Sequence, residues 1–467
     1  MIGLGIDFGT SNSAAAWFDG KTIHLIQIEP DALTVPTAIH LDQDFQTLTG
    51  STAIRAYVEE NTDRRVEITA KAIGEVTLDI GKAMAGPGPD GDDGRYTIYG
   101  PAEDYGLPGR LFLGIKRLLG KESIKRLMVF ERPFRVVALI TPILVSIRQV
   151  LQPYLNKDHR PVFLGRPVDF EGSGSGKNAL AVDRLLEACK YAQLNEVVFY
   201  PEPAAACLSF IHKQNIQHDS TILTIDFGGG TLDLSLVHYH QQQFNVVGTQ
   251  GVAIGGDYID QLLYQKLIFP ALGEGVPWSR TVDGLLIETP FPFDLYETAL
   301  LNWTITHTLN QNQFLARIHD FISHAKNAPE DKEKLQRLRD IILHNYSYLI
   351  FQAIKSAKAE LSDQEQTILD IPEINLEIIL SRAKLNDIIQ GVLNTLQDCI
   401  QQLLERCQVD KANINYVVRT GGSSKLVAVI DLLDELFPNK VVQHDTFTSV
   451  ASGLAIASYY EYACDIE

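Results

Sequence analysis

Two copies of one short motif carry the residues of this chain that are best suited to chemistry. An isoleucine followed by Asp-Phe-Gly stands at residues 6–9 and again at residues 225–228. A carboxylate at the end of a strand can hold a hydrated divalent cation, and a glycine-rich turn after it offers backbone N–H groups to phosphate oxygens. Glycine suits such a turn because a Cβ would block close approach. Asp7 and Asp226 are therefore candidate metal-binding and catalytic carboxylates.

The flanks of the two copies also match. Each copy follows a short apolar run and leads into a second apolar run that a polar turn closes. A single copy would be weak evidence, since a hairpin turn capped by aspartate has the same composition. Two matched copies so far apart predict a duplicated domain that holds a polyanion between its halves.

The composition of the chain limits what it can bind. At 467 residues the chain should form two or more domains. Its formal net charge of -18 argues against a general nucleic-acid or anionic-membrane partner, because the mean field repels phosphate. A phosphate pocket remains compatible with that charge, since local N–H groups and a bound metal set the local potential.

Cellular location is predicted from three further features. The five cysteines are widely scattered, no apolar stretch is expected to be long enough to span a bilayer, and the first motif begins almost at residue 1. These features predict a cytoplasmic protein with reduced thiols and with no nucleic-acid or membrane partner.

The order of the predicted elements indicates an α/β protein. Strand-like runs open the chain, regular patterning is lost at residues 56–109, and strands and helices then alternate. Strands are predicted at residues 22–28, 35–40, 162–164, 197–199 and 416–418, and helices at residues 136–155, 179–192, 384–407, 426–437 and 449–459. Residues 258–358 are predicted to be mainly helical, and the last helix is expected to dock on the first half.

A glycine-rich stretch at residues 172–178 is similar to a phosphate-binding P-loop. However, Glu171 stands where that loop requires its first glycine, and Asn178 replaces its Ser or Thr. A flexible turn before a helix is the preferred interpretation.

Taken in order, the motifs resemble those of the actin/hexokinase/heat-shock ATPase superfamily, and within it the DnaK-type heat-shock chaperone ATPase domain. The matching segments are the first phosphate loop at residues 5–13, the Asn-Glu-Pro-Thr-Ala-Ala signature at 200–205, the second phosphate loop at 226–233, the Gly-Gly-x-Asp-Phe-Asp element at 255–260, the adenine-binding helix at 357–362 and the adenosine loop at 421–425. These anchors span almost the whole chain in the order that the family has.

The resemblance implies a duplicated actin-like ATPase fold, of class α/β with a ribonuclease-H-like motif, whose two lobes enclose a nucleotide cleft. Lobe I would comprise residues 1–219 and 446–467, with an insertion at about 60–108. Lobe II would comprise residues 220–445, with a mainly helical insertion at about 269–345. No peptide-binding domain is expected, so the form resembles the short, YegD-like branch of heat-shock-protein homologues.

The resemblance also implies ATP or ADP and Mg²⁺ as cofactors, with client proteins or co-chaperones as further partners. The residues that would act in catalysis are Asp7, Glu202, Asp226, Thr231 and Asp233, of which Asp7 and Asp226 would orient the metal through water. The residues that would bind the nucleotide are Gly9, Thr10, Ser11, Asn12, Gly228, Gly229, Gly230, Gly255, Gly256, Asp257, Lys355, Lys358, Ser362, Gly421, Gly422, Ser423 and Lys425.

Two of these assignments have equally simple structural explanations. Glu202 stands between two prolines, and an acidic residue at a helix start is favourable without any ligand. Lys358 and Ser362 lie one helical turn apart and could be surface residues.

The chain departs from the family pattern at the position of a catalytic lysine. In the family this lysine follows a Gly-x-Ala-Ala element, whereas here residues 50–53 read Gly-Ser-Thr-Ala and Ile54 follows them. A cation near the transferred phosphoryl group is therefore missing unless Arg55 or Lys116 reaches in. Losing one such contact costs roughly 3–4 kcal/mol of transition-state stabilisation. Ala359 also replaces the arginine that stacks on adenine, and Lys425 replaces the arginine beside the adenosine loop.

Three functions remain open from the sequence. The first is a chaperone-like weak ATPase whose lobes close on Mg-ATP and reopen after slow hydrolysis. The second is a nucleotide-responsive binding or regulatory module with little or no hydrolysis, as Ile54 and Ala359 suggest. The third is an actin-like filament protein, which the long insertions disfavour because they would obstruct polymer contacts.

Overall fold

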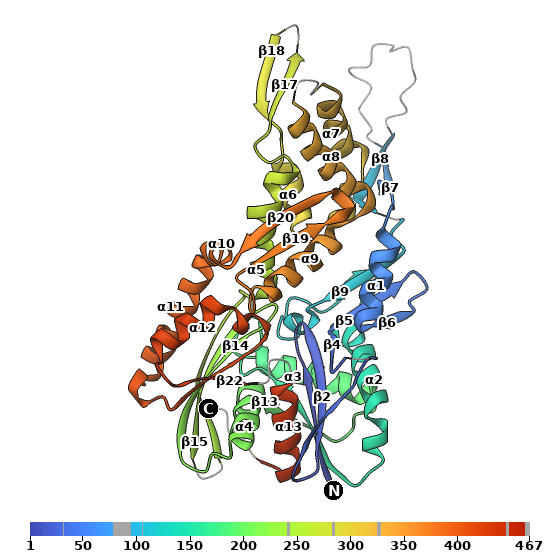
Figure 1. Ribbon diagram of the computed structural model, residues 1–467. Helices are drawn as coiled ribbons and strands as arrows, with labels where there is room; N and C mark the ends of the chain where they lie inside the picture. The colour runs from blue at the N-terminus through green and yellow to red at the C-terminus, as the bar shows by residue number, and fades with distance from the viewer. Residues whose placement is uncertain are drawn as a thin grey trace.

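Two mixed β-sheets form the centres of two lobes in the computed structural model (Figure 1). The structure describes residues 1–30, 32–77, 95–104, 106–240, 243–282, 285–324, 328–444 and 448–462. We use lobe I for the sheet of residues 2–201 with the elements packed around it, and lobe II for the sheet of residues 220–443 with its own elements. The predicted boundary between residues 219 and 220 stays a prediction, and the one between 445 and 446 lies outside the described residues.

The two sheets have the same strand order and directions. The first runs β13-β12-β1-β2-β3 and the second runs β22-β21-β14-β15-β16. In each, the central strand pairs with a parallel strand on one side and with an antiparallel hairpin partner on the other. The strands are β1 (Ile2–Phe8), β2 (Asn12–Phe18), β3 (Ile23–Ile26), β12 (His159–Arg166), β13 (Val197–Pro201), β14 (Ser220–Phe227), β15 (Leu232–His240), β16 (Gln243–Val252), β21 (Tyr416–Thr420) and β22 (Val441–Gln443). The duplication expected from the repeated motif is therefore present in the strand order.

Helices cover both faces of the lobe I sheet, as the fully buried run of β1 requires. On one face lie α2 (Val136–Leu155) and α3 (Lys177–Tyr191), which share a core with β1. On the other lie α4 (Glu202–Gln214) and α13 (Ser449–Tyr460), which pack on each other. Helix α13 docks on the first sheet, as expected for the last helix. A Cβ on Gly5 would lie 2.4 Å from the Ala451 carbonyl oxygen, so glycine permits this close approach.

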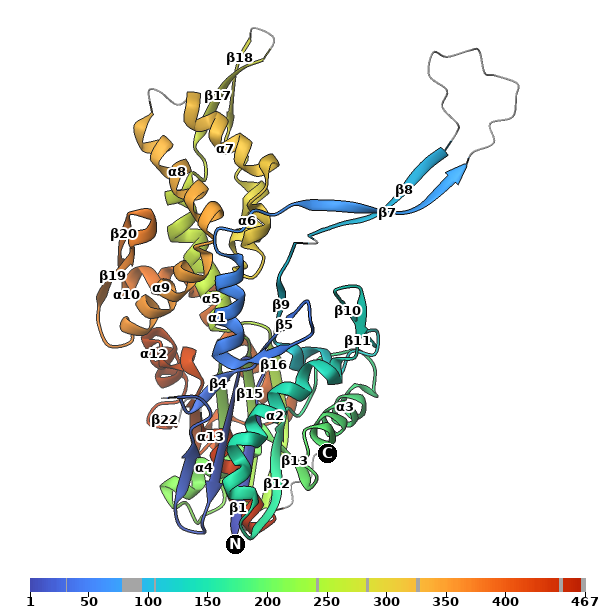
Figure 2. The same ribbon diagram turned by 90° about the vertical axis from the view of Figure 1, so that its right-hand side faces the viewer.

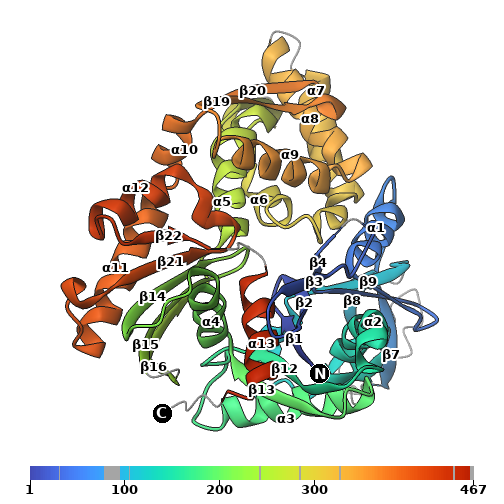
Figure 3. The same ribbon diagram turned by 60° about the horizontal axis from the view of Figure 1, so that its bottom comes forward.

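The α4–α13 layer also joins the lobes. Its apolar core includes side chains of β14, β15 and β21, and α4 contacts the second sheet directly. Figure 3 shows α4 and α13 between the two sheets. The outer face of the second sheet is covered by α11 (Gln390–Cys407) and α12 (Val427–Leu436).

The predicted insertions contain more strand than expected. The region of lobe I that lacks a regular pattern holds α1 (Gly50–Asn61) and the hairpin of β7 (Ile68–Thr77) with β8 (Arg95–Asp104), which projects from the body in Figure 2. In lobe II the mainly helical insertion also contains the hairpin of β17 (Pro277–Val282) with β18 (Leu285–Pro290). Its helices are α6 (Asp294–Leu300), η4 (Thr306–Leu309), α7 (Asn312–His324) and α8 (Pro329–His344).

The remaining elements connect these parts. They are β4 (Thr34–Pro36), β5 (Ala38–Asp42), β6 (Thr47–Thr49), β9 (Gly109–Leu113), η1 (Ile115–Leu118), β10 (Leu127–Val129), β11 (Arg132–Phe134), α5 (Gly256–Leu263), η2 (Tyr264–Ile268), η3 (Phe269–Leu272), α9 (Ser347–Glu360), β19 (Gln366–Ile371), η5 (Pro372–Ile374), β20 (Leu376–Ser381), α10 (Arg382–Ile388), η6 (Lys411–Asn413) and η7 (Gly422–Lys425). The P-loop-like stretch forms a turn before α3, as predicted.

The expectation that no apolar stretch is long enough to span a bilayer was wrong. Among the described helices, α2 is long and apolar enough to cross a bilayer by length and composition. Its side chains at Leu139, Ile143 and Ile147 are buried in the core of lobe I. Its apolar character therefore has a structural cause inside the fold.

Candidate active site

The two predicted phosphate loops are the β1–β2 turn and the β14–β15 turn. In the first, a Cβ on Gly9 would lie 2.2 Å from the Asn12 carbonyl oxygen, so a side chain does not fit. In the second, the Gly228 N–H donates to the Thr231 carbonyl oxygen at 3.0 Å and closes the turn. Both turns therefore follow their aspartate directly, as the motif predicts.

The loops meet across the gap between the lobes. A Cβ built on Gly229 or on Gly230 would lie 3.5 Å from the Oγ of Ser11. Residues of two sheets more than two hundred positions apart thus face each other at van der Waals range. This juxtaposition is what the duplicated motif requires of a site shared by both halves.

Four carboxylates, those of Asp7, Glu202, Asp226 and Asp233, gather behind these loops, and the pKa values of the three aspartates are raised. Burial raises the pKa of Asp7 to about 8, with Glu202 and Asp226 adding to the effect and Lys116 opposing it. Burial also raises the pKa of Asp226 to about 7, and the charges of Asp233 and Glu202 add to that rise. Asp7 and Asp226, the two predicted metal-binding residues, are therefore close enough to repel each other.

Two opposing influences act on the pKa of Asp233. Burial raises its pKa to about 6, whereas the Thr231 hydroxyl donates a hydrogen bond to Oδ2 at 2.6 Å and so favours the charged form. The structure therefore brings together all five residues predicted to act in catalysis.

Lys116 supplies the cation that the sequence left open. Its Nζ donates to Oε1 of Glu202 at 2.5 Å, and the residue is only 5% exposed. Lys116 lies on η1, and this helix begins directly after Gly114, which adopts a left-handed conformation. By contrast, Arg55 is exposed on α1, and Ile54 is outside the described cavity lining. Of the two replacements that the sequence left open, Lys116 is therefore the one that lies in the acidic cluster.

Sequence reasoning missed two arginines that support this cation. Arg117 Nη2 donates to the Gly230 carbonyl oxygen at 3.1 Å, which links lobe I to the second phosphate loop. The guanidinium of Arg184 donates to four carbonyl oxygens around the end of η1, those of Leu118, Leu119, Lys121 and Ile124. The sequence contains one clue to Arg117. Lys116 and Arg117 stand inside the apolar run of residues 111–119, and charged side chains in such a run need polar partners.

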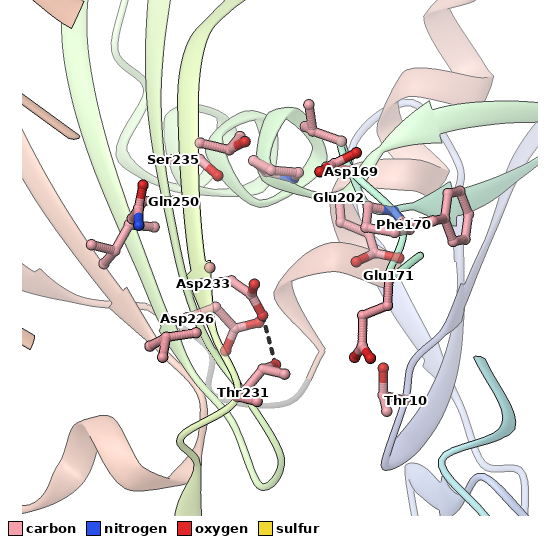
Figure 4. Close-up of a pocket in the computed structure, with 18 of the residues that line it drawn as sticks. Thr10, Asp169, Phe170, Glu171, Glu202, Asp226, Thr231, Asp233, Ser235 and Gln250 are labelled. Carbon is pink, nitrogen blue, oxygen red and sulfur yellow. Dashed lines mark hydrogen bonds between the residues drawn. The ribbon is translucent and has the colours of Figure 1, made fainter. Parts of the chain in front are cut away.

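A cavity of about 840 Å³ opens beside the acidic cluster, which lies within the size range of ligand pockets. Figure 4 shows Ser235 and Gln250 on its lobe II wall, Asp169 and Glu171 on its lobe I wall, and Thr10 facing the Thr231 side. Lys116, Glu202, Asp226 and Asp233 also line it. Four of the five catalytic candidates therefore line a space large enough for a phosphate chain and water, and Asp7 is not among the lining residues.

The predicted nucleoside segments converge on the second phosphate loop from the other side. The Gly256 N–H donates to the Gly228 carbonyl oxygen at 2.9 Å, and the Ser423 hydroxyl donates to the same oxygen at 3.2 Å. A Cβ on Gly255 would lie 2.3 Å from the Gly229 carbonyl oxygen. Gly421, with φ of 82°, packs equally closely on the Phe227 carbonyl. None of these residues lines the described cavity, so they form a separate wall.

The predicted nucleoside lysines have partners within lobe II. Lys358 donates to Oδ1 of Asp260 at 2.6 Å and to the Gly256 carbonyl oxygen at 3.0 Å. Lys355 Nζ lies 3.2 Å from Oδ1 of Asp257. These contacts hold α9 against the start of α5.

The other predicted ligand residues lie near these segments without a described contact to the cavity. Asn12 begins β2, Gly422 begins η7, Ser362 follows α9 and is half-buried, and Lys425 ends η7 and is exposed. The roles assigned to individual site residues stay predictions.

The residues of the cluster fit a divalent cation held through water. Within the described ranges, no group of three or more His, Cys, Asp or Glu side chains is arranged to ligate a metal directly. Asp7 and Asp226 are half-buried, burial raises the pKa values of both, and the charge of Asp226 adds to the rise at Asp7, so a bound cation would favour the ionised forms of both carboxylates. Mg²⁺, which keeps several waters and takes one or two carboxylates, suits this donor set.

Comparison with known proteins identifies the family. A family model described as "Hsp70 protein" matches residues 182–270 and 313–459, together just over half of the chain. The chain belongs to the Hsp70 family. The predicted DnaK-type resemblance and the actin-like ATPase fold are thereby confirmed. The assignment to a YegD-like branch stays a prediction.

The Hsp70 relatives are distant but match along the chain. "Chaperone protein dnaK" of Guillardia theta is 23% identical over 97% of this chain and 59% of its own length. The protein of the same name from Thalassiosira pseudonana is 24% identical, with 97% and 61% covered. "Chaperone protein dnaK3" of Thermosynechococcus vestitus is 24% identical, with 97% and 54% covered. The chain thus spans about three fifths or less of the length of these curated relatives.

The family match covers only part of the site. It includes Glu202, the second phosphate loop, Gly255 and Gly421, whereas the first phosphate loop and Lys116 lie outside the matched residues. Residues 271–312, which form most of the extra material in lobe II, fall between the two matched segments.

Proposed function

We propose that this Hsp70-family chain is a chaperone-like protein that binds Mg-ATP between its lobes and hydrolyses it slowly. The observation that carries the proposal is the convergence of the two phosphate loops, because a Cβ added to Gly229 or to Gly230 would lie 3.5 Å from the Oγ of Ser11. Lys116 adds the one buried cation that a phosphoryl-transfer site needs beside its carboxylates.

Each part of the cluster has a role in this proposal. The N–H groups of Gly9, Gly229 and Gly230 and the hydroxyl of Thr10 hold the phosphate oxygens. Bound Mg²⁺ supplies charge neutralisation at the phosphates, held through water by Asp7 and Asp226. Lys116 donates to a phosphate oxygen where negative charge increases.

The attacking water needs an acceptor for its proton. Asp233 suits this role, because its pKa of about 6 lies near the working pH of a general base and the Thr231 hydroxyl fixes its orientation. Glu202 orients Lys116 through their hydrogen bond. Catalysis then consists of positioning and electrostatic stabilisation.

Opening and closing of the lobes around the nucleotide is part of the same proposal. The α4–α13 layer contacts both sheets and so can serve as the hinge. We propose client proteins or co-chaperones as partners, a cytoplasmic location, and no nucleic-acid or membrane partner, in keeping with the net charge of -18.

A nucleotide-responsive module with little or no hydrolysis is the second candidate. Ala359, at the position where the family stacks an arginine on adenine, favours it. The position of Lys116 weakens it, because the missing cation was its other support. A filament-forming protein is the third candidate, and ATP-dependent pelleting would favour it.

Single-turnover hydrolysis of radiolabelled ATP, with Mg²⁺ and with EDTA, tests the proposal. Asp226→Asn should lower the hydrolysis rate by about 10²–10³-fold, because it removes a charge that orients the metal. Asp219→Asn, an exposed position just before the same strand, should leave the rate unchanged. A folded wild-type protein that neither binds nor hydrolyses Mg-ATP would sink the proposal, and binding without hydrolysis would select the second candidate.

A further inference from the structure

The cavity beside the acidic cluster lies on the other side of the phosphate loops from the nucleoside wall. Thr10 and Thr231 line it, one from each loop, whereas Gly255, Lys358 and Gly421 do not. A nucleotide that rests on both loops with its nucleoside against that wall therefore has the end of its phosphate chain directed at the cavity.

Alternate residues at the start of β15 mark a path from the loops along one wall of the cavity. Thr231 comes directly before the strand, and Asp233 and Ser235 lie on one face of it, because successive side chains of a strand point to opposite faces. Figure 4 shows this order, with Asp233 between Thr231 and Ser235. Ser235 is only 3% exposed, so a molecule that reaches it from solvent must pass through the cavity.

The cavity opens to solvent at a rim of exposed residues. Ser123, Glu171 and Ser173 of lobe I and Arg406 of lobe II are exposed and line it. Ser173 belongs to the glycine-rich stretch of residues 172–178, which is similar to a P-loop in sequence and forms the turn before α3. This stretch therefore contributes to the rim of the cavity.

The charges along the cavity change sign between the acidic cluster and the rim. The cluster places three carboxylates, those of Glu202, Asp226 and Asp233, beside the one ammonium of Lys116. In the rest of the lining, basic residues outnumber acidic ones by four to two. They are Arg117, Lys121, Lys177 and Arg406, with Asp169 and Glu171. Because low-dielectric walls focus such a field, an anion released at the cluster is drawn toward the rim.

The partners of the basic residues near the rim hold them loosely. Glu171 pairs with the Nε of Arg117 at 3.4 Å and with the Nζ of Lys121 at 4.0 Å. Partly exposed ion pairs of this length are weak. A phosphate dianion can therefore replace the Glu171 carboxylate on either cation as it passes.

We propose that this cavity is the exit route of inorganic phosphate, which leaves at the rim while ADP stays bound on the opposite side of the loops. After cleavage, the phosphates of ADP and the carboxylates of the cluster repel the separated phosphate, and the nucleoside occupies the other side. The identity of the anion rests on the proposed function, whereas the passage between solvent and the cluster does not.

Entry of a phosphate mimic tests the route, because entry and exit follow the same path in opposite directions. Beryllium fluoride is added to protein loaded with Mg²⁺ and fluorescent mant-ADP, and a chase with excess ATP measures how fast mant-ADP becomes locked in. Ser173→Trp should abolish locking on the wild-type timescale by filling the rim. Ser175→Trp is the matched control, an exposed position of the same turn that does not line the cavity, and should lock at the wild-type rate. Equal rates in the two variants would overturn the proposal.

Lys121→Ala tests the charge of the rim without adding bulk. Removing one unit charge that acts at about 4 Å in water should slow locking by about fivefold. Lys125→Ala is the control, since Lys125 is exposed a few residues further along and is outside the described lining. Equal rates in these two variants would contradict the proposed attraction of the anion by the rim.

Thiol modification gives a second measurement that needs no nucleotide. Ser235→Cys places a thiol inside the cavity, and an anionic thiosulfonate reagent should modify it, as mass spectrometry of the peptide around position 235 would show. Adding Ser173→Trp should abolish this modification, and adding Ser175→Trp should not. An unreactive thiol in Ser235→Cys would overturn the route. If the protein proved unable to bind ADP, the proposed function would fail, and this measurement would still decide whether the cavity admits an anion.

Discussion

The Nζ atom of Lys116 lies 2.5 Å from Oε1 of Glu202, although the two residues are 86 positions apart in the chain. One residue comes from η1 and the other from the first turn of α4. The pair places a buried positive charge near Asp7 and Asp233, whose negative charges would otherwise repel a phosphate. Lys116 is therefore the side chain whose removal should change the site most.

Lys116→Ala should lower single-turnover ATP hydrolysis by about 10²–10³-fold, because it removes a preorganised donor from the phosphoryl group. Lys177→Ala is the matched control, since Lys177 lines the same cavity but pairs with Asp169 at 2.7 Å. The control should hydrolyse ATP at close to the wild-type rate. Equal losses in both variants would show that the effect is one of general charge.

Ile54→Lys should not increase hydrolysis. The helix α1 that carries Ile54 packs on β5, β6 and β9, and the cation of the site already comes from Lys116. We expect the single-turnover rate to stay within about twofold of the wild type, as for a substitution distant from the site. A gain of tenfold or more would mean that position 54 reaches the phosphates after all.

The acidic cluster should make the stability of the nucleotide-free protein depend on pH. The pKa values of Asp7, Asp226 and Asp233 rise from 3.8 to about 8, 7 and 6, so the folded state holds protons that the unfolded chain releases above about pH 4. The folded state binds more protons in this window, and its stability therefore falls as pH rises from about 4 to about 8. The melting temperature without metal should decline between pH 6 and pH 8, and Asp7→Asn should flatten that decline.

Mg-ATP should stabilise the protein more strongly as the pH rises, which opposes the decline in stability of the nucleotide-free protein. A cation between Asp7 and Asp226 requires their ionised forms, so binding should release protons and should stabilise the protein more at pH 8 than at pH 6. Calorimetry in two buffers of different ionisation enthalpy measures the protons released. Binding without proton release would mean that these carboxylates are already ionised in the free protein.

Gly255→Ala should abolish nucleotide binding while the protein stays folded. Its Cβ would lie 2.3 Å from the Gly229 carbonyl oxygen, so the second phosphate loop must move. Gly391→Ala is the matched control, because no other atom lies within 4 Å of the added Cβ on α11. The control should increase the free energy of unfolding by about 0.5–1 kcal/mol, since alanine is the better helix former. Equal nucleotide affinity in the two variants, measured by calorimetry, would contradict the proposed packing.

Arg184→Ala should lower both the free energy of unfolding and the rate of ATP hydrolysis, although Arg184 is not predicted to contact the nucleotide. Its guanidinium binds four carbonyl oxygens around the end of η1, and losing charged hydrogen bonds of this kind costs about 1.5–3 kcal/mol of unfolding free energy. Arg184→Lys should recover only part of the loss, because an ammonium cannot reproduce the planar fork. Denaturant unfolding and single-turnover kinetics measure the two effects. A destabilised variant with an unchanged hydrolysis rate would show that η1 does not position Lys116.

The sequence allowed the two halves of the site to be predicted because each half is local. A strand, an aspartate and a glycine turn lie within a few residues, and β1 and β14 end as the motif requires, at Asp7–Phe8 and at Asp226–Phe227. Repetition then implied the duplicated sheets. The position of Lys116 could not be derived in the same way, because it depends on how η1 packs against α4.

The ion-pair partners of the predicted nucleoside lysines could not be predicted from the sequence either. Lys355 and Lys358 were predicted to bind the nucleotide, but their partners are Asp257 and Asp260, which are about a hundred residues away in the chain. The hairpins β7–β8 and β17–β18 were not predicted, since short strands without a clear alternating pattern resemble irregular loops or helix.

Docking of α13 on the first sheet has a consequence during biosynthesis. Strand β13 completes that sheet at Pro201, yet the helix that covers its apolar face begins only at Ser449. At translation rates of about 5–20 residues per second, α13 is synthesised roughly 10–50 s after the sheet whose face it covers. The nascent N-terminal half therefore emerges from the ribosome with part of this apolar face still uncovered.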